Sequence, residues 1–259
     1  MVLVLDVGNT NIKYGIFDGD VLKHSFRTHT DVNKTADDIG IIIMQFFGRF
    51  DLPIQSIEGI IVASVVPHMN YTLEHMCSIY FGISPIFVGP GIKTGLNILY
   101  DDPKELGADR IANAVAALNK YKKTCVIIDF GTATTFSCVS KKGEFLGGAI
   151  FPGFRIAMKA LSLDAANLFS VELVRPKQAI GKNTKTCIQS GLLFGFCGAV
   201  DSIIEKMKKE IPDDDIQVVA TGGAAQLILL ESEHDFEIDH SLSLTGIKLL
   251  YDKNKSGGK

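Results

Sequence analysis

Residues 2–20 read VLVLDVGNTNIKYGIFDGD, and residues 125–144 read CVIIDFGTATTFSCVSKKGE. Each stretch starts with an apolar β-branched run, passes through an Asp into a Gly-containing loop rich in Thr or Asn, and enters a second strand-like run that ends at a polar Gly tip. Because a repeated sequence unit indicates a repeated structural unit, we expect two similar halves that face each other across one cleft. With a carboxylate from each half, Asp6 and Asp129, such a cleft suits a phosphate chain and its metal ion.

The composition indicates a folded chain with a large core and argues against some partners. The sequence has 259 residues, 46% of them hydrophobic, which is enough for about two domains of ordinary size. Its net charge of −3 argues against nucleic acid as the main partner, because phosphate backbones select strongly basic surfaces. A small nucleotide is not excluded, since a few local groups can hold it.

The cysteines and the apolar runs predict a soluble protein of the cytoplasm. The sequence has five cysteines, an odd number, and no two of them have CxxC spacing. This pattern fits free, reduced thiols. The first apolar run is interrupted at Asp6 and is too short for a secretory signal. No uninterrupted run reaches the ~18 apolar residues of a membrane span. We therefore expect no membrane partner.

Apolar periodicity predicts strands and helices in a similar order in both halves. The predicted strands are Val2–Asp6, Lys13–Phe17, Val21–Thr28, Gly59–Ser64, Pro85–Val88, Thr124–Asp129, Thr134–Val139, Phe145–Ile150 and Ile216–Thr221. The predicted helices are Thr35–Phe50, Tyr71–Phe81, Asp109–Tyr121, Phe154–Asn167, Thr186–Lys209, Ala224–Glu231 and Leu242–Tyr251. Residues 92–106 read as irregular, and residues 253–259 as a fraying end. The pattern predicts a mixed α/β fold with domains at 1–118 and 119–259, the last helix being a candidate to pack back on the first domain.

The first Asp-Gly loop, residues 6–13 (DVGNTNIK), has the groups that hold phosphate. Gly8 lets the backbone approach a ligand closely. Asn9, Thr10 and Asn11 add amide and hydroxyl donors beside backbone N–H groups, and a carboxylate at the loop mouth suits Mg²⁺. A single copy would be read as a plain hairpin turn, but the repetition favours ligand binding.

The second loop, residues 129–135 (DFGTATT), repeats this argument with three hydroxyls. Two carboxylates near one another are costly unless a cation accompanies them, so the pair implies at least one cation. A third Gly-containing turn, Gly222-Gly223, follows a predicted strand. The Gly pair there would let a flat ligand lie against the backbone, although a tight strand-to-helix turn is the better interpretation when this segment is taken alone.

The start of the helix after residue 107 has two interpretations. Asp109 is either the N-cap of that helix, with Arg110 solvated beside it, or a general base next to an anion-binding guanidinium. A cation in the first turn of a helix opposes the macrodipole, which slightly favours the second interpretation. Residues 89–94 lack the Gly that a P-loop requires before its Lys, and the six histidines show no metal-ligand spacing.

Taken in order, these motifs resemble the acetate and sugar kinase/actin-like ATPase superfamily and, within it, the type III pantothenate kinase family nearly end to end. The matching segments are Asp6–Lys13, Ser64–Pro67, Tyr100–Pro103, Gly107–Arg110, Asp129–Thr135, Gly147–Ile150, Pro152–Gly153, Gly181–Thr184, Ser190–Gly191 and Thr221–Gly223. The resemblance implies two actin-like (ribonuclease H-like) domains, each a mixed sheet flanked by helices, with a cleft between them.

The resemblance also implies a reaction, the transfer of the ATP γ-phosphate to pantothenate in the first step of coenzyme A synthesis. Asp109 would accept the hydroxyl proton, Asp129 would hold K⁺ or NH₄⁺, and Asp6 would lie near Mg²⁺ through water. Family members are homodimers, so the resemblance implies a homodimer here. The residues implied to bind ATP are Asp6, Val7, Gly8, Asn9, Thr10, Asn11, Ile12, Lys13, Thr132, Gly222 and Gly223. Those implied to surround pantothenate are Tyr100, Gly107, Ala108, Asp109, Arg110 and Thr184.

Three other functions are compatible with parts of this pattern. Another small-molecule kinase or a polyphosphate hydrolase of the superfamily would keep both loops, but these proteins are generally longer. A kinase-like regulatory protein would be expected to lose acidic or hydroxyl groups from the loops, and here Asp6, Asp109 and Asp129 are all present. An actin-like or chaperone ATPase requires large inserted subdomains, for which this length leaves little room.

Overall fold

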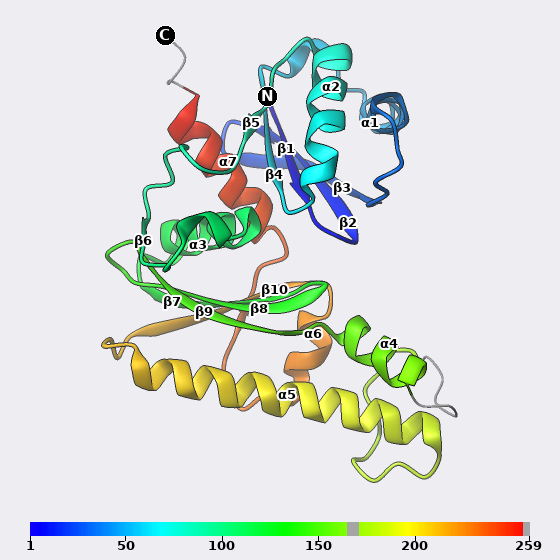
Figure 1. Cartoon of the computed structure of the whole chain (residues 1–259), viewed down its shortest axis with the longest axis vertical. Coiled ribbons are helices and arrows are strands. Elements are labelled where there is room, and N and C mark those ends of the chain that lie inside the picture. The colour runs from blue at the N-terminus through cyan, green and yellow to red at the C-terminus, as the bar shows by residue number, and fades with distance from the viewer. Residues whose placement is uncertain (165–170, 256–259) are drawn as a thin grey trace. The chain divides into compact units, whose positions relative to one another are not determined.

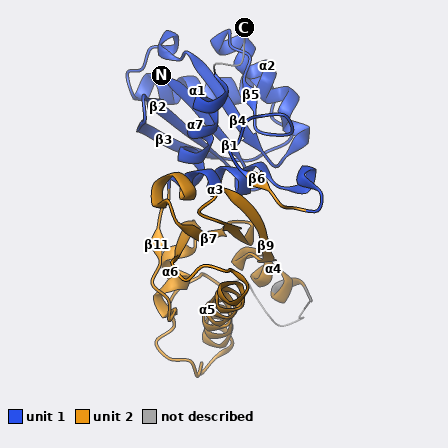
Figure 2. Cartoon of the chain, turned by 90° about the vertical axis from the view of Figure 1, so that its left-hand side faces the viewer, with its two compact units in different colours: residues 1–96, 101–116, 241–259 blue, residues 97–100, 117–240 orange. Residues whose placement is uncertain are grey.

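Two mixed β-sheets, each flanked by helices, form the core of the protein, as the sequence predicted (Figure 1). The computed structural model describes residues 1–164 and 171–255. The chain divides into two units, coloured separately in Figure 2. The first unit comprises Met1–Leu96, Asp101–Ala116 and Ser241–Lys259, and the second comprises Asn97–Tyr100 and Ala117–His240.

The elements follow the predicted order closely. In the first part of the chain they are β1 (Val2–Val7), β2 (Asn11–Asp18), β3 (Val21–His29), α1 (Ala36–Arg49), β4 (Gly59–Ser64), α2 (Asn70–Phe81), β5 (Ile86–Phe87), β6 (Asn97–Ile98) and α3 (Ala108–Tyr121). They continue as β7 (Thr124–Phe130), β8 (Ala133–Val139), β9 (Glu144–Pro152), α4 (Phe154–Asp164), α5 (Thr184–Glu210), β10 (Ile216–Gly222), α6 (Ala225–Ile228), β11 (Glu237–Ile238) and α7 (Leu242–Asn254).

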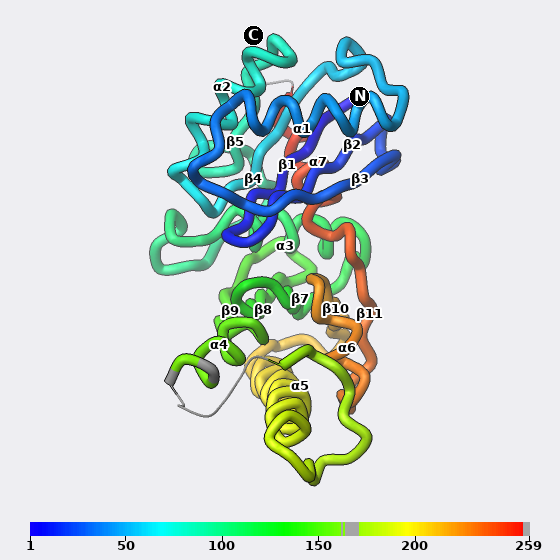
Figure 3. The backbone as a smooth tube through the Cα atoms, turned by 90° about the vertical axis from the view of Figure 1, so that its right-hand side faces the viewer, coloured from blue at the N-terminus to red at the C-terminus, as the bar shows by residue number. Residues whose placement is uncertain are grey.

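The sheet of the first unit carries helices on both faces. Its strand order is β3-β2-β1-β4-β5, with β1 antiparallel to β2 and parallel to β4. Leu3, Leu5 and Val7 pack in one core with residues of α1 and α2, whereas α7 packs against β1, β2 and β4 (Figure 3). Because successive strand side chains point to opposite faces, Asp6 points to the face that α7 covers.

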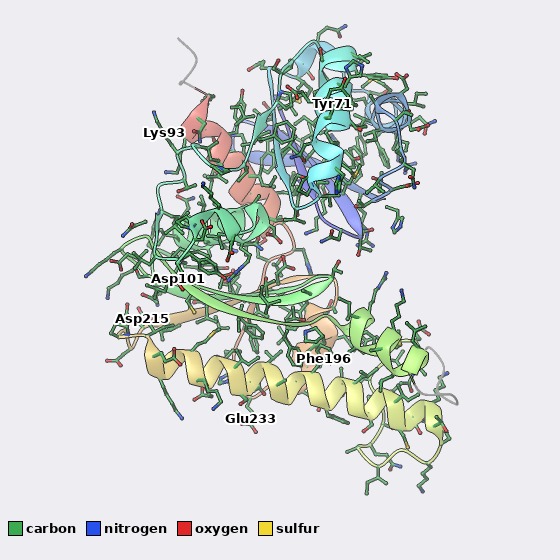
Figure 4. The ribbon with its side chains drawn as sticks, viewed as in Figure 1. Tyr71, Lys93, Asp101, Phe196, Asp215 and Glu233 are labelled. Atoms are coloured by element: carbon green, nitrogen blue, oxygen red, sulfur yellow. The ribbon has the colours of Figure 1, made fainter. Side chains whose placement is uncertain are left out.

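In the sheet of the second unit, β7 has the same kind of strand neighbours as β1 has in the first. Its order is β11-β10-β7-β8-β9-β6, with β7 antiparallel to β8 and parallel to β10. Ile128 and Phe130 share a core with α5. Phe196 of α5, labelled in Figure 4, lies with its ring 5.3 Å from that of Phe151 on β9. By the same alternation, Asp129 points to the face opposite α5.

Helix α5 resembles a membrane span only in length and composition. Among the described residues it is the one helix that is long and apolar enough for such a span, and 50% of its most apolar window is buried. Its buried side chains, including Leu193, Phe196 and Val200, pack in the core of the second unit. A core helix accounts for this pattern.

Several element boundaries differ from the prediction for local reasons. Helix α5 begins two residues earlier than predicted, because Asn183 caps it by accepting a hydrogen bond from Thr186 N at 2.9 Å. Residues 92–106 are not wholly irregular, since they contain β6 and a 3₁₀ turn at Pro103–Glu105. The helix predicted at Ala224–Glu231 is short and ends in a 3₁₀ turn. The predicted end of the fourth helix, at Asn167, and the last four residues of the fraying end lie outside the described residues.

Candidate functional site

Asp6 occupies the centre of a small polar cluster on the α7 face of the first sheet. Its side chain is mostly buried, with the residue 8% exposed. Lys13, directly opposite on β2, places Nζ 3.2 Å from Asp6 Oδ2. Ser243 of α7 donates a hydrogen bond from Oγ to the same oxygen at 2.7 Å. The sequence predicted a carboxylate open to a cleft, whereas the structure shows a carboxylate held by an ammonium and a hydroxyl.

The loop after Asp6 is tied down through its carbonyl oxygens. Thr30, which follows β3, donates Oγ1 to Gly8 O at 2.6 Å and its N–H to Thr10 O at 2.9 Å. Gly8 N–H is bonded to Asn11 O at 3.1 Å. Carbonyl oxygens repel anions, so their engagement with Thr30 favours phosphate at this loop. The side chains of Val7 and Ile12 are in the core, so only the backbone of these two residues is available to a ligand.

Asp109 lies in the first turn of α3 and is not its N-cap. The helix begins at Ala108, and Asp109 Oδ1 accepts a hydrogen bond from the N–H of Arg110 at 2.8 Å. A Cβ added at Gly107 would lie 2.5 Å from this oxygen. The carboxylate therefore takes its position only because residue 107 has no side chain.

The electrostatic surroundings of Asp109 favour its protonated form. Burial raises the pKa of Asp109 above its ordinary value, and the negative charge of Asp6 raises it further, while the N–H and the charge of Arg110 oppose the shift. Arg110 is 5% exposed, so the interpretation of Arg110 as a solvated residue is wrong. A half-buried carboxyl with a pKa raised by burial and by a nearby carboxylate is a candidate functional group.

Packing within the first unit brings the Asp6 and Asp109 segments together. Val65 donates its N–H to Val7 O at 3.0 Å, and its Cγ1 lies 3.8 Å from the Cβ position at Gly107. A Cβ at Gly246 of α7 would lie 1.9 Å from Ala112 O of α3, so the two helices are in backbone contact there. Ser243 and Asp109 each precede this contact by one helical turn.

In the second unit, Asp129 lies in a row of hydroxyl groups. It is registered with Thr135 of β8 and with Thr221 of β10, and in-register side chains of neighbouring strands share a face. Thr221 is 0% exposed, and in the described part of the chain its Oγ1 has no hydrogen-bond partner. The structure thus places the hydroxyl-bearing residues Thr135 and Thr221 on either side of the predicted carboxylate of Asp129.

The turns beside Asp129 are packed tightly against one another. A Cβ at Gly222, which has φ +93°, would lie 2.6 Å from Phe130 O, and a Cβ at Gly153 would lie 2.0 Å from Thr132 O. The backbone packing alone therefore requires Gly222, whereas nothing lies within 4 Å of a Cβ at Gly223. Binding of ATP by Thr132, Gly222 and Gly223 stays a prediction.

Two predicted substrate residues lie in other parts of the second unit. The ring of Tyr100 is 6.2 Å from that of Phe145. Thr184, the first residue of α5, lines a cavity of about 780 Å³ together with Leu161, Cys187 and Leu192. This cavity is mostly apolar with a few polar groups, a composition that suits an organic ligand.

Metal binding would have to use few protein ligands. Among the described residues, no three His, Cys, Asp or Glu side chains gather into a metal site. Mg²⁺ that retains waters and binds phosphate oxygens needs only one or two carboxylates, which Asp6 satisfies. A monovalent cation fits one carboxylate and neutral oxygens, which the row of Asp129, Thr135 and Thr221 provides.

Sequence reasoning missed two side chains that shape these clusters, Thr30 and Ser243, and it gave Thr221 no role beside Asp129 although this residue stands in the matched segment Thr221–Gly223. Ser243 left a weak signal, since it is a polar residue between Leu242 and Leu244 on a helix whose neighbouring positions are buried. Thr30 left no signal, because a Thr at a strand end is common in any sheet.

A match to the family described as type III pantothenate kinase covers residues 2–206. Among solved structures, a conserved candidate transcriptional activator of the Baf family from Campylobacter jejuni has a TM-score of 0.58 and 22% identity, covering 98% of this chain and 99% of that one. A candidate 2-dehydro-3-deoxygalactonokinase from Sinorhizobium meliloti has a TM-score of 0.57 and 10% identity, with 100% of both chains covered.

Component A of the (R)-2-hydroxyglutaryl-CoA dehydratase from Acidaminococcus fermentans has a TM-score of 0.54 and 13% identity, covering 100% of this chain and 99% of that one. At these identities the likeness establishes the fold, that of actin-like ATPases and sugar kinases, and does not extend to the reaction.

Proposed function

This chain belongs to the type III pantothenate kinase family, and we propose that it transfers the γ-phosphate of ATP to the primary hydroxyl of pantothenate. The observation that carries the proposal is the family match over residues 2–206. The position of Asp109, next to the Asp6 loop in the same unit, supports it. The family implies ATP with Mg²⁺, while pantothenate as the acceptor is part of the proposal.

In the proposed reaction the hydroxyl oxygen of pantothenate forms a bond to the γ-phosphorus. The bond from that phosphorus to the β,γ-bridging oxygen breaks, and the hydroxyl proton passes to Asp109. The products are ADP and 4′-phosphopantothenate. Phosphoryl transfer of this kind depends mainly on positioning and on stabilisation of charge.

Asp109 suits the role of the base through its pKa. A carboxylate with an ordinary pKa of about 3.9 is a weak proton acceptor at neutral pH. Burial and the charge of Asp6 raise the pKa of Asp109, which strengthens it as a base. Gly107 leaves the space in which its carboxylate stands.

The loop of residues 6–13 would hold the phosphates of ATP. Thr30 engages the carbonyl oxygens of Gly8 and Thr10, and Lys13 brings a positive charge to the strand next to the loop. Asp6 would bind Mg²⁺ through water, and the ion, when bound, neutralises charge on the β- and γ-phosphates. Thr132, Gly222 and Gly223 are proposed to complete the ATP site.

We assign K⁺ or NH₄⁺ to Asp129. Its two registered neighbours, Thr135 and Thr221, offer neutral hydroxyl oxygens. The buried hydroxyl of Thr221 supports this assignment, because a polar atom at 0% exposure needs a partner.

Arg110 is proposed to bind the carboxylate of pantothenate, with Tyr100 and Thr184 as further contacts. The cavity that Thr184 lines supports the assignment of Thr184 as a substrate contact. Formation of a homodimer and location in the cytoplasm complete the proposal.

The direct test is ATP-dependent phosphorylation of pantothenate by the purified protein, with product identified by mass and with K⁺ present or omitted. A panel of sugars and short carboxylic acids as alternative acceptors tests the other kinases of this fold. We expect phosphopantothenate as the main product and a higher rate with K⁺. Phosphorylation of another acceptor at a higher rate than pantothenate, or no product at all, would overturn the proposal.

A further inference from the structure

Ser243 connects the C-terminal helix to the Asp6 cluster and lies outside the residues that match the family. It is 1% exposed. Its Oγ donates to Asp6 Oδ2 at 2.7 Å and accepts a hydrogen bond from Lys13 Nζ at 3.3 Å. Lys13 Nζ is itself 3.2 Å from Asp6 Oδ2. The three side chains, from β1, β2 and α7, therefore form a closed triangle.

The hydroxyl is the neutral member of this triangle, and both of its partners are ionised. Hydrogen bonds to ionised groups are shorter and stronger than those between neutral groups. Both contacts to Asp6 are made at Oδ2, so Oδ1 is the oxygen that neither neighbour engages. This arrangement selects one orientation of the carboxylate and leaves one of its oxygens for a ligand.

The ammonium group of Lys13 has two possible partners, the Asp6 carboxylate and the phosphate chain of a bound nucleotide. Lys13 holds Asp6 when no nucleotide is bound, but a phosphate chain at the loop competes for the same positive charge. The Ser243 hydroxyl carries no charge to be drawn to phosphate, so it keeps its bond to Asp6 when the ammonium shifts. We propose that Ser243 is a positioning residue that holds the Asp6 carboxylate in the orientation that receives MgATP. This inference rests on the assignment of Asp6 to MgATP in the proposed function.

Helix α7 is anchored firmly enough to act in this way. Gly246 places its backbone against Ala112 of α3. At 5% exposure, Lys248 pairs with Asp252 at 2.5 Å and lies 3.8 Å from Asp20 in the turn between β2 and β3. The helix is thereby held against α3 and the turn after β2, and it also packs against β1, β2 and β4, which places Ser243 beside Asp6.

The test is Ser243→Ala, with Thr245→Val as the matched control. Thr245 is half-buried on the same helix, two residues away, and Val retains its shape while removing its hydroxyl. We expect Ser243→Ala to weaken MgATP binding about tenfold, as measured by calorimetry, because a hydrogen bond to a charged group is lost. Pantothenate affinity should stay unchanged in both variants, and Thr245→Val should bind MgATP as the wild type does. Thermal unfolding without ligand checks that each variant is folded.

A double-mutant cycle separates positioning from general packing. If Ser243 acts through Asp6, Ser243→Ala should have little further effect on MgATP affinity in an Asp6→Ala background. Equal MgATP affinity of Ser243→Ala and wild type, an equal loss of pantothenate affinity, or full additivity with Asp6→Ala would each overturn the inference. Failure of the proposed function is recognised separately, as wild-type protein that forms no phosphopantothenate in the same preparation.

Discussion

Asp6 and Asp129 occupy equivalent places in their sheets, but their neighbours differ in charge. Asp6 is flanked in register by Lys13 on β2 and by Ala63 on β4. Asp129 is flanked in the same register by Thr135 and by Thr221. The first row contains its own cation, and the second has a hydroxyl on each side of the carboxylate.

The difference gives the two copies of one structural unit different electrostatic surroundings. A buried carboxylate is costly unless a positive charge or hydrogen-bond donors accompany it. In the first row the chain supplies both through Lys13 and Ser243. In the second row the flanking groups are oxygens that suit an external cation. We therefore propose that the first row serves MgATP and that the second depends on K⁺ or NH₄⁺.

The largest effect is expected from a residue outside both rows. Asp109→Asn should lower kcat by about 10²–10⁴-fold, the usual contribution of a general base, because the amide cannot accept the proton. ATP and pantothenate affinities should change little, since the Oδ1 that accepts from Arg110 N–H is retained. Steady-state kinetics and calorimetry on the same preparation measure both. Near-wild-type kcat would show that Asp109 is not the base, and the proton acceptor would then have to be sought among the side chains around Asp6 and Asp129.

Gly107→Ala tests the position of Asp109 without changing its chemistry. The added Cβ would stand 2.5 Å from Asp109 Oδ1, so the carboxylate has to move. A misplacement of about 1 Å can cost about 10²-fold in rate, and we expect a loss of that order in kcat with unchanged MgATP affinity. Unaltered kcat in a folded Gly107→Ala protein would show that the carboxylate position seen here is not the reactive one.

Thr135→Lys would make the second row resemble the first. Thr135 stands opposite Asp129 as Lys13 stands opposite Asp6, so an ammonium there should occupy the position of the external cation. We expect the ratio of rates with and without K⁺ to fall several-fold. Thr135→Met, which has a side chain of similar length without charge, is the control. The proposal that Asp129 binds the activating cation fails if Lys and Met give the same K⁺ dependence.

The smallest effect concerns the stability of the Asp109→Asn variant. Because the folded pKa of Asp109 is raised by burial and by Asp6, its contribution to stability is present below the unfolded pKa and is lost as pH rises through the folded pKa. The variant should therefore gain Tm relative to wild type between acid and neutral pH. A difference in Tm that does not change with pH would contradict the raised pKa.

Much of this fold could be predicted from local sequence. The repeated strand–Asp-Gly loop placed β1, β2, β7 and β8 correctly, because alternation of apolar residues follows directly from the pleat of a strand. The long helix α5 was evident from its periodicity. Its first turn was misplaced, because the capping role of Asn183 depends on a side-chain bond to Thr186.

The site could be predicted only in part, because its geometry is made by contacts distant in sequence. The motifs pointed to Asp6 and Asp109, but not to the electrostatic coupling between them. Ser243 lies 237 positions from Asp6 in the sequence, and no local sequence pattern predicts a hydrogen bond over that separation. The close approach of Gly107 to Asp109 Oδ1 is likewise a property of the folded backbone, although both residues stand in one motif.

The central claim, that the two carboxylates serve different ions, is tested most directly by comparing Asp6→Ala with Asp129→Ala. For each variant, MgATP affinity is measured by calorimetry and the K⁺ concentration for half-maximal activation by kinetics. We predict that Asp6→Ala weakens MgATP binding and leaves the K⁺ midpoint unchanged, whereas Asp129→Ala raises the K⁺ midpoint or abolishes K⁺ activation while MgATP affinity at saturating K⁺ changes little. Equal shifts of both quantities in both variants would contradict the account.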